Sequence, residues 1–161
     1  MNEQQLTQIT RQALADSTRI PISIRVVGAW ILASAVLLAR RHPGLHKPLK
    51  RELRDIQHLF EAAISDRHPD TKGVLENVHD QTRFIEATQA SMGDQEPVVC
   101  TLKARQIWLL VSALQLATRH PQVPNREEII FLGRQFQVAL TEHNPVVREV
   151  LEMGWDQRYD R

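Results

Sequence analysis

The stretch WILASAVLLARRHP at residues 30–43 is followed, 78 positions later, by WLLVSALQLATRHP at residues 108–121. Nine of the fourteen aligned positions are identical, and they include the tryptophan, the histidine and the proline. Agreement at residue types as uncommon as these is far above chance. The two stretches therefore predict that one helical unit occurs twice in this chain.

The alignment resumes beyond these stretches after a contraction of two residues. At a displacement of 76 positions, Phe60 aligns with Phe136 and Pro69 aligns with Pro145. We interpret the pattern as a tandem duplication of a three-helix unit within one domain. Its predicted parts are an N-terminal helix in residues 1–19, copy one at 20–83, a helix extension and linker at 84–97, and copy two at 98–158, all within a single domain of residues 1–161.

The helix limits in each copy follow from its prolines and capping residues. A His-Pro pair ends the first helix, because proline disfavours helix at the residue before it and has no amide hydrogen to donate. The third helix is expected to begin just after Pro69 or Pro145, and that of copy one to continue to about Met92. The remaining expectations are second helices at about 48–65 and 125–142, N-caps at Ser23 and Thr101, and histidines at 42 and 120 that cap free carbonyls.

Composition agrees with a helical protein of ordinary size. Hydrophobic residues make up 42% of the 161 residues and aromatic residues only 5%, which favours aliphatic helix packing over a β-sandwich. With a helix at about Glu3 to Ala15, the predicted fold is an all-α, compact bundle of about seven helices.

The apolar stretch at residues 26–39 is predicted to be a buried core helix. Its fourteen residues are too few to cross a bilayer, which takes about 20, and it begins too far along the chain for a signal peptide. Where copy two has Arg105 and Gln115, copy one has Val27 and Leu37, so this helix is apolar nearly all round. We expect the N-terminal helix to supply the additional cover, and we predict no membrane partner.

The net charge says little about function, whereas the cysteine content indicates the cellular compartment. The formal net charge is +1, so any attraction to nucleic acid must come from local clustering. Cys100 is the single cysteine and has no partner for a disulfide or a zinc site. A buried thiol in a reducing compartment is the interpretation that fits, and we predict a cytoplasmic protein.

A local cluster of positive charge lies in residues 40–54, where Glu52 is the single acid. The corresponding part of copy two has no such excess, so the shared unit does not require it. A solvated helix face is the usual explanation of such a charge run. A helical row of cations about one turn apart is also able to contact successive phosphates, and an acidic protein partner is a further alternative. The candidate binding residues are Arg40, Arg41, Lys47, Lys50, Arg51 and Arg54.

Glu76 and His79 have the spacing of a helical metal-binding pair, and Asp80 follows directly. A carboxylate-bridged site needs a second such pair, but copy two has Trp155 where copy one has His79. The chain also lacks the glycine-rich phosphate-binding motifs and the G-x-S-x-G nucleophile motif. We therefore predict no catalytic residue, no metal ligand and no cofactor.

The function expected from the sequence is that of a non-enzymatic binding or adaptor protein that acts through protein–protein contacts of copy one. Its expected partner is another protein or a second copy of the chain. The alternative is a nucleic-acid-binding protein that uses the basic helix face at residues 40–54. A metal-dependent hydrolase or oxidase centred on Glu76, His79 and Asp80 is the third hypothesis.

Overall fold

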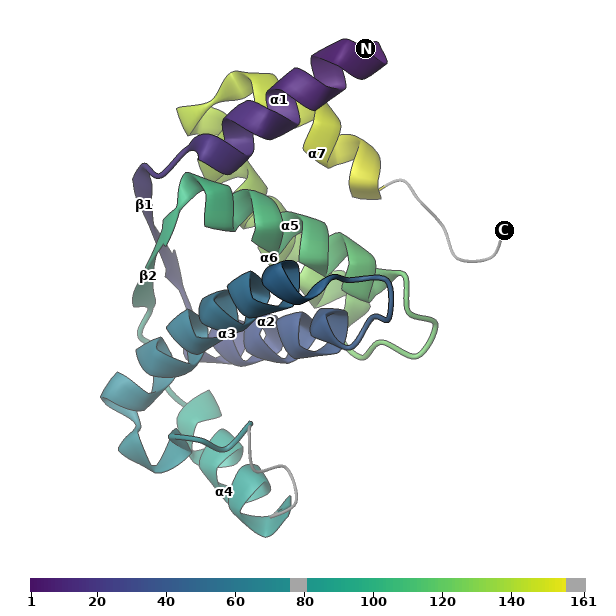
Figure 1. Cartoon of the computed structure of the whole chain (residues 1–161). Coiled ribbons are helices and arrows are strands. Elements are labelled where there is room, and N and C mark those ends of the chain that lie inside the picture. Colours follow the sequence, from purple (N-terminus) through teal and green to yellow (C-terminus); the bar gives the residue numbers. More distant parts are fainter. Residues whose placement is uncertain (76–80, 156–161) are drawn as a thin grey trace.

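The computed structural model describes residues 1–75 and 81–155 (Figure 1). The predicted helical fold is confirmed, but a small two-stranded sheet accompanies the helices and was not predicted. In chain order the elements are α1 (Glu3–Ala15), β1 (Arg19–Ile24), α2 (Val26–Arg40), α3 (Lys47–Arg67), the 3-10 helix η1 (Pro69–Thr71), α4 (Gln81–Met92), β2 (Val98–Lys103), α5 (Ala104–Thr118), α6 (Arg126–His143), the 3-10 helix η2 (Pro145–Val147) and α7 (Arg148–Trp155).

The strands β1 and β2 form an antiparallel ribbon in which Ile22 lies directly opposite Cys100. Alternate residues of each strand face the helices, and Ile24 and Leu102 are buried there. Ser23 and Thr101, predicted to cap helices, lie instead on the exposed side of the ribbon, so this prediction was wrong. The alternation of β-branched and polar residues favours an extended backbone at these positions.

The helices α2 and α5 leave opposite ends of the ribbon and converge at their carboxyl ends (Figure 1). Each begins directly after its strand, with Arg25 as the N-cap of α2 and Lys103 as the N-cap of α5. The order strand, helix, helix, 3-10 helix, helix occurs in residues 19–92 and again in residues 98–155. The ribbon thus joins the two parts of the chain at one side, and the helices join them at the core.

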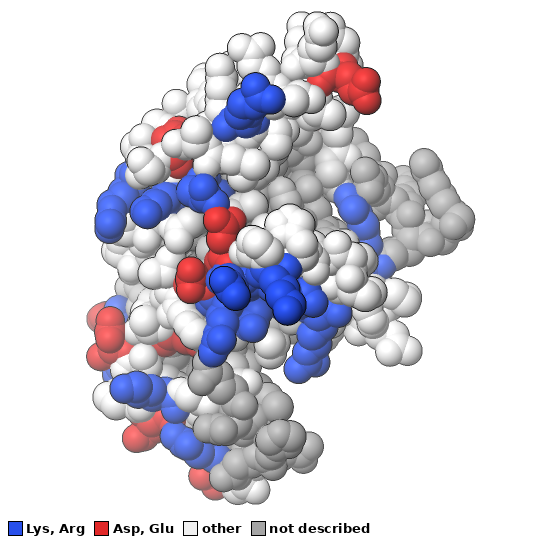
Figure 2. Space-filling view, viewed as in Figure 1, with Lys and Arg blue, Asp and Glu red and all other residues white. Residues whose placement is uncertain are grey.

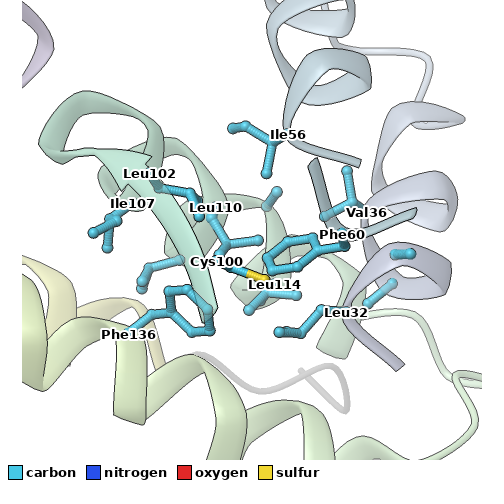
Figure 3. Close-up of a cluster of buried hydrophobic side chains, with 14 of the residues drawn as sticks. Leu32, Val36, Ile56, Phe60, Cys100, Leu102, Ile107, Leu110, Leu114 and Phe136 are labelled. Atoms are coloured by element: carbon cyan, nitrogen blue, oxygen red, sulfur yellow. The ribbon is translucent and has the colours of Figure 1, made fainter. Parts of the chain in front are cut away.

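The core lies between the ribbon and four helices, α2, α3, α5 and α6 (Figure 3). Phe60 from α3 and Phe136 from α6 are fully buried, and their rings meet edge to face with centroids 5.9 Å apart. Aliphatic side chains such as Leu32, Leu110 and Leu114 surround the two rings. Burying large apolar side chains of this kind is the main source of stability in a domain of this size.

The apolar stretch predicted to be a core helix is α2, and its burial is confirmed. Its cover comes from α3, α4, α5 and α6, whereas α1 packs against α5 and η2. The prediction that α1 covers the first helix of copy one is therefore wrong. Arg105 of α5 donates to the carbonyl oxygen of Leu14 at 3.0 Å, and Asp16 meets His143 at 2.7 Å, which fix the carboxyl end of α1.

The third helix of residues 19–92 begins later than predicted. Pro69 opens a 3-10 turn, and Gly73 follows with a φ of 74°, in the left-handed region where a right-handed helix cannot continue. The helix α4 comprises Gln81–Met92, and its carboxyl end at Met92 agrees with the prediction. Within the described part of the chain, no helix is both long and apolar enough to cross a membrane.

Candidate nucleic-acid interface

Four of the predicted binding residues share one face of α3. Lys47, Lys50, Arg51 and Arg54 are separated by three, four and seven positions, a spacing that places side chains on one side of a helix. The opposite side carries the buried residues Leu53, Ile56 and Phe60, so packing against the core turns the cations toward solvent. Lys50 is half-buried and the other three cations are exposed.

The start of α3 is fixed by local interactions. His46 is its N-cap, and its Nδ1 accepts a hydrogen bond from the backbone amide of Leu49 at 3.3 Å. Pro48 lies in the first turn, where a missing amide hydrogen costs nothing. The first cation of the face, Lys47, thus stands at a defined helix start.

The structure separates the two arginines that precede α3. Arg41 is exposed at the C-cap of α2. Arg40 is half-buried, and its guanidinium donates to the side-chain oxygen of Gln57 at 2.7 Å. Since Gln57 in turn donates to Glu61 at 3.0 Å, Arg40 belongs to a network inside the fold. We therefore define the basic face by its other five members, Arg41, Lys47, Lys50, Arg51 and Arg54.

The charge of the basic face is not balanced by ion pairs. None of its five members makes a hydrogen bond from its side chain or an ion pair with an acid in the described chain. The acid within the cluster, Glu52, is instead paired with Arg105 of α5. Figure 2 shows Lys and Arg side chains gathered over the amino-terminal half of α3. Positive potential is thus concentrated on this surface despite a net charge of only +1.

Comparison with known protein families, curated proteins and solved structures gave no significant match. The counterpart of α3 in the second part of the chain is α6, whose first turn contains Glu127 and Glu128. One of the two long helices is therefore basic at its start and the other is acidic. This difference in charge distinguishes α3 from α6, although the two helices have the same place in the order of elements.

A second group of cations lies on the ribbon, and the sequence analysis missed it. Arg19 stands directly opposite Lys103 on the exposed side, and Arg25 follows the other end of β1. Like charges that face each other across strands are destabilising unless another group balances them. The alternation in RIPISI at residues 19–24 and VVCTLK at residues 98–103 is the signal that would have revealed both the ribbon and its exposed side.

The residues of the third hypothesis, Glu76, His79 and Asp80, lie outside the described residues. Elsewhere, in residues 1–75 and 81–155, no group of three or more His, Cys, Asp or Glu side chains is arranged to hold a metal ion. Cys100 belongs to β2 and its side chain is buried on the inner side of the ribbon, and this burial raises the pKa of its thiol to about 11. The thiol is therefore protonated at neutral pH, a state in which it is a poor nucleophile.

Proposed function

We propose that this protein binds nucleic acid through the basic face, which four cations of α3 and Arg41 at the end of α2 form. The observation that carries the proposal is that five neighbouring cations make no ion pair with an acid of the described chain. Phosphate groups would supply the missing negative charge, and the release of counterions from the nucleic acid would favour association. The acidic first turn of α6 repels phosphate, so we expect nucleic acid to lie against α3 and not against α6.

The length of the face fits a nucleic-acid backbone. Seven residues separate Lys47 from Arg54, which is about 10 Å at the helical rise of about 1.5 Å per residue. Successive phosphates of one strand in B-form DNA rise by about 3.4 Å along the helix axis and also turn around it, so a straight face of this length reaches about two or three of them. Residues 40–54 contain no Phe, Tyr or Trp side chain on which an unpaired base could stack. A duplex is therefore the expected ligand.

We also propose that the two parts of the chain arose by tandem duplication and are related by an approximate twofold axis. Aligned positions meet each other in two places that support this view. Ile22 pairs with Cys100 at the centre of the ribbon, and Phe60 touches Phe136 in the core. In a twofold arrangement, equivalent residues contact each other only where the axis passes. The basic face then belongs to copy one alone, as a feature added to the shared unit.

A protein partner for copy one is the second candidate function. Ile85 and Met92 of α4 are 50% and 40% exposed, and large apolar side chains at such exposure are favoured contact residues. An acidic protein would also satisfy the basic face. We place either activity in the cytoplasm, on the support of the single reduced cysteine.

The test is binding of a labelled DNA duplex by the natural protein and by a variant with Lys47, Lys50, Arg51 and Arg54 changed to Gln. The matched control changes four exposed cations elsewhere to Gln, so that net charge falls equally. These control positions are Arg11, Lys72, Arg134 and Arg148. We expect the first variant to lose binding and the control to retain it, with helicity of both checked by circular dichroism.

Three results would redirect the account. Equal loss of binding in the two variants would mean that overall charge, and not this face, attracts DNA. If DNA binding is lost when Arg19, Arg25 and Lys103 are changed to Gln but is retained by the α3 variant, the interface lies on the ribbon. Absence of duplex binding at low salt, with salt-dependent binding of polyglutamate that requires the basic face, would identify an acidic protein as the partner.

A further inference from the structure

The repeated Arg-His-Pro segments lie on one cavity. At the converging carboxyl ends of α2 and α5, a cavity of about 650 Å³ is lined by Arg41, His42 and Pro43 from one segment and by Arg119, His120 and Pro121 from the other. The Leu-Ala pair that precedes each segment by one residue contributes apolar wall. Segments 78 positions apart in the sequence thus form two sides of one site, at the ends of α2 and α5 that lie near each other in Figure 1.

Both histidines are held in the same way. Nδ1 of His42 accepts the backbone amide of Gly44 at 3.0 Å, and Nδ1 of His120 accepts the backbone amide of Gln122 at 3.2 Å. The predicted capping of carbonyls by these rings is therefore wrong, because each ring accepts instead. In a neutral imidazole whose Nδ1 accepts, Nε2 carries the proton. Each histidine consequently offers a donor, whether it is neutral or charged.

The two arginines add positive charge to the same cavity. Arg41 is exposed and makes no side-chain hydrogen bond within the described chain. Arg119 is half-buried; its Nη2 donates to the carbonyl oxygen of Gly154 at 3.3 Å, while its Nε is buried and without a partner among the described residues. No Asp or Glu lines the cavity. Its two guanidinium groups are permanent cations, and the acceptor nitrogen of each imidazole is already occupied by a backbone amide.

The helix ends do not cancel this charge. The carboxyl end of a helix carries about half a negative charge, spread over its last free carbonyl groups. Here the turns that follow satisfy some of these groups, since His42 and His120 each donate a backbone hydrogen bond at 3.1 Å, to Ala39 and Ala117 respectively. Two guanidinium charges exceed the remaining dipole, so the cavity favours an anion.

We propose that this cavity binds a small organic anion, in which a phosphate or carboxylate group is carried on an apolar body. The anionic group would accept from Arg41, Arg119 and the Nε2 atoms of the two histidines, and the apolar body would lie against the leucines and prolines. A volume of about 650 Å³ is within the range of small-molecule sites, roughly 300–1,000 Å³, and is too large for inorganic phosphate to fill alone.

The test is calorimetric titration with phenyl phosphate, benzoate, inorganic phosphate and the neutral analogue benzyl alcohol. We expect saturable binding of phenyl phosphate or benzoate, much weaker binding of inorganic phosphate, and none of benzyl alcohol. Arg119→Gln and Arg41→Gln should each weaken binding about tenfold or more, because each removes a charged donor. Arg134→Gln, which changes an exposed arginine outside the cavity, is the control and should bind as the natural protein does.

Two readouts keep the proposal falsifiable. Phenyl phosphate should shift the imidazole NMR signals of His42 and His120 together, since both line the site. Should Arg119→Gln unfold because the contact with Gly154 is lost, the exposed Arg41→Gln provides the same test. Benzyl alcohol binding as tightly as phenyl phosphate, unchanged affinity in the folded arginine variants, or no saturable binding would each overturn the proposal.

The proposed anion site does not rest on nucleic-acid binding. Arg119 and His120 are not part of the basic face of α3, so Arg119→Gln should leave duplex binding unchanged. Arg41 belongs to both surfaces, and a bound organic anion would occupy it. Failure of one proposal is thus distinguishable from failure of the other.

Discussion

Phe60 and Phe136 meet edge to face at the centre of the core, with ring planes 88° apart. One ring comes from α3 and the other from α6, so the contact joins the two parts of the chain. The positive edge of one ring faces the negative face of the other in this geometry, which adds to the gain from burial. The two halves therefore share a core and do not fold around separate ones.

The first prediction concerns this pair. Phe60→Leu and Phe136→Leu should each destabilise the fold. The double-mutant cycle should give a coupling energy of about 0.5–1.5 kcal/mol, because either substitution alone already removes the edge-to-face contact. Urea unfolding followed by circular dichroism measures both quantities. Phe131→Leu is the control, since Phe131 is 64% exposed and should change stability by less than about 0.5 kcal/mol. Strict additivity of the two core changes would contradict the contact.

The second prediction tests the register of the ribbon. Residues directly opposite each other in an antiparallel pair have Cα atoms about 4.5–5.5 Å apart, within the range that a disulfide spans. Ile22→Cys should therefore form an intramolecular disulfide with Cys100 under mild oxidation, detected as the loss of free thiol in the monomer. Pro21→Cys is the control, because its side chain is on the exposed side of the ribbon and Cys100 is on the buried side. Disulfide formation at position 21 alone would mean a shifted register.

The third prediction concerns the packing of α7 on α6. A Cβ atom at Gly133 would lie 2.6 Å from the ring of Trp155, which is fixed by its hydrogen bond to Gln137 at 2.7 Å. Gly133→Ala should therefore destabilise the fold by about 1–3 kcal/mol in thermal or urea unfolding. Gly93→Ala is the matched control, since a Cβ atom there has no neighbour within 4 Å. A stabilised Gly133→Ala variant would show that α7 does not pack as described.

The fourth prediction is a pH dependence at the turn before β2. The carboxylate of Asp94 lies 2.8 Å from Nε2 of His68 and 3.0 Å from the guanidinium of Arg67, and these contacts lower its pKa to about 2. A carboxyl group with a lowered pKa stabilises the fold above its unfolded value of 3.8, and this contribution is lost as pH falls toward 2. Asp94→Asn should thus lower Tm near neutral pH.

The difference in Tm between the natural protein and Asp94→Asn should narrow as pH falls from about 4 toward 2. Asp70→Asn serves as the control, because Asp70 is exposed and makes no ion pair in the described chain. A Tm difference that stays constant over this interval would mean that Asp94 is not stabilised by its ionised form.

The sequence allowed the helices to be predicted well wherever their ends are marked by local chemistry. The limits of α1, and the ends of α2, α3 and α5 near His-Pro pairs, follow from apolar spacing and from the backbone restriction that proline imposes. The strands were missed because each is only six residues long and runs directly into a helix. With Ser23 and Thr101 taken as N-caps, Ile24 and Leu102 were assigned to the helix that follows.

The packing of the elements against one another was predicted less well than the limits of the helices. The amphipathic pattern of α1 shows that it must pack, but α5 rather than α2 receives it, because Arg105 and His143 provide partners for its carboxyl end. The basic face was predicted from spacing, whereas the internal role of Arg40 depends on Gln57, seventeen residues away in the sequence. The cavity at Arg119 and His120 depends on how two helices converge, which repeated residues alone do not determine.

The most direct test of the central claim is the salt dependence of duplex DNA binding by the natural protein and by the variant with Lys47, Lys50, Arg51 and Arg54 changed to Gln. Each phosphate contact adds about 0.9 to the magnitude of the slope of log K against log salt concentration. If the basic face contacts the backbone, the variant should bind more weakly and its slope should be smaller in magnitude by roughly 2 to 3. An unchanged slope and affinity would contradict the account.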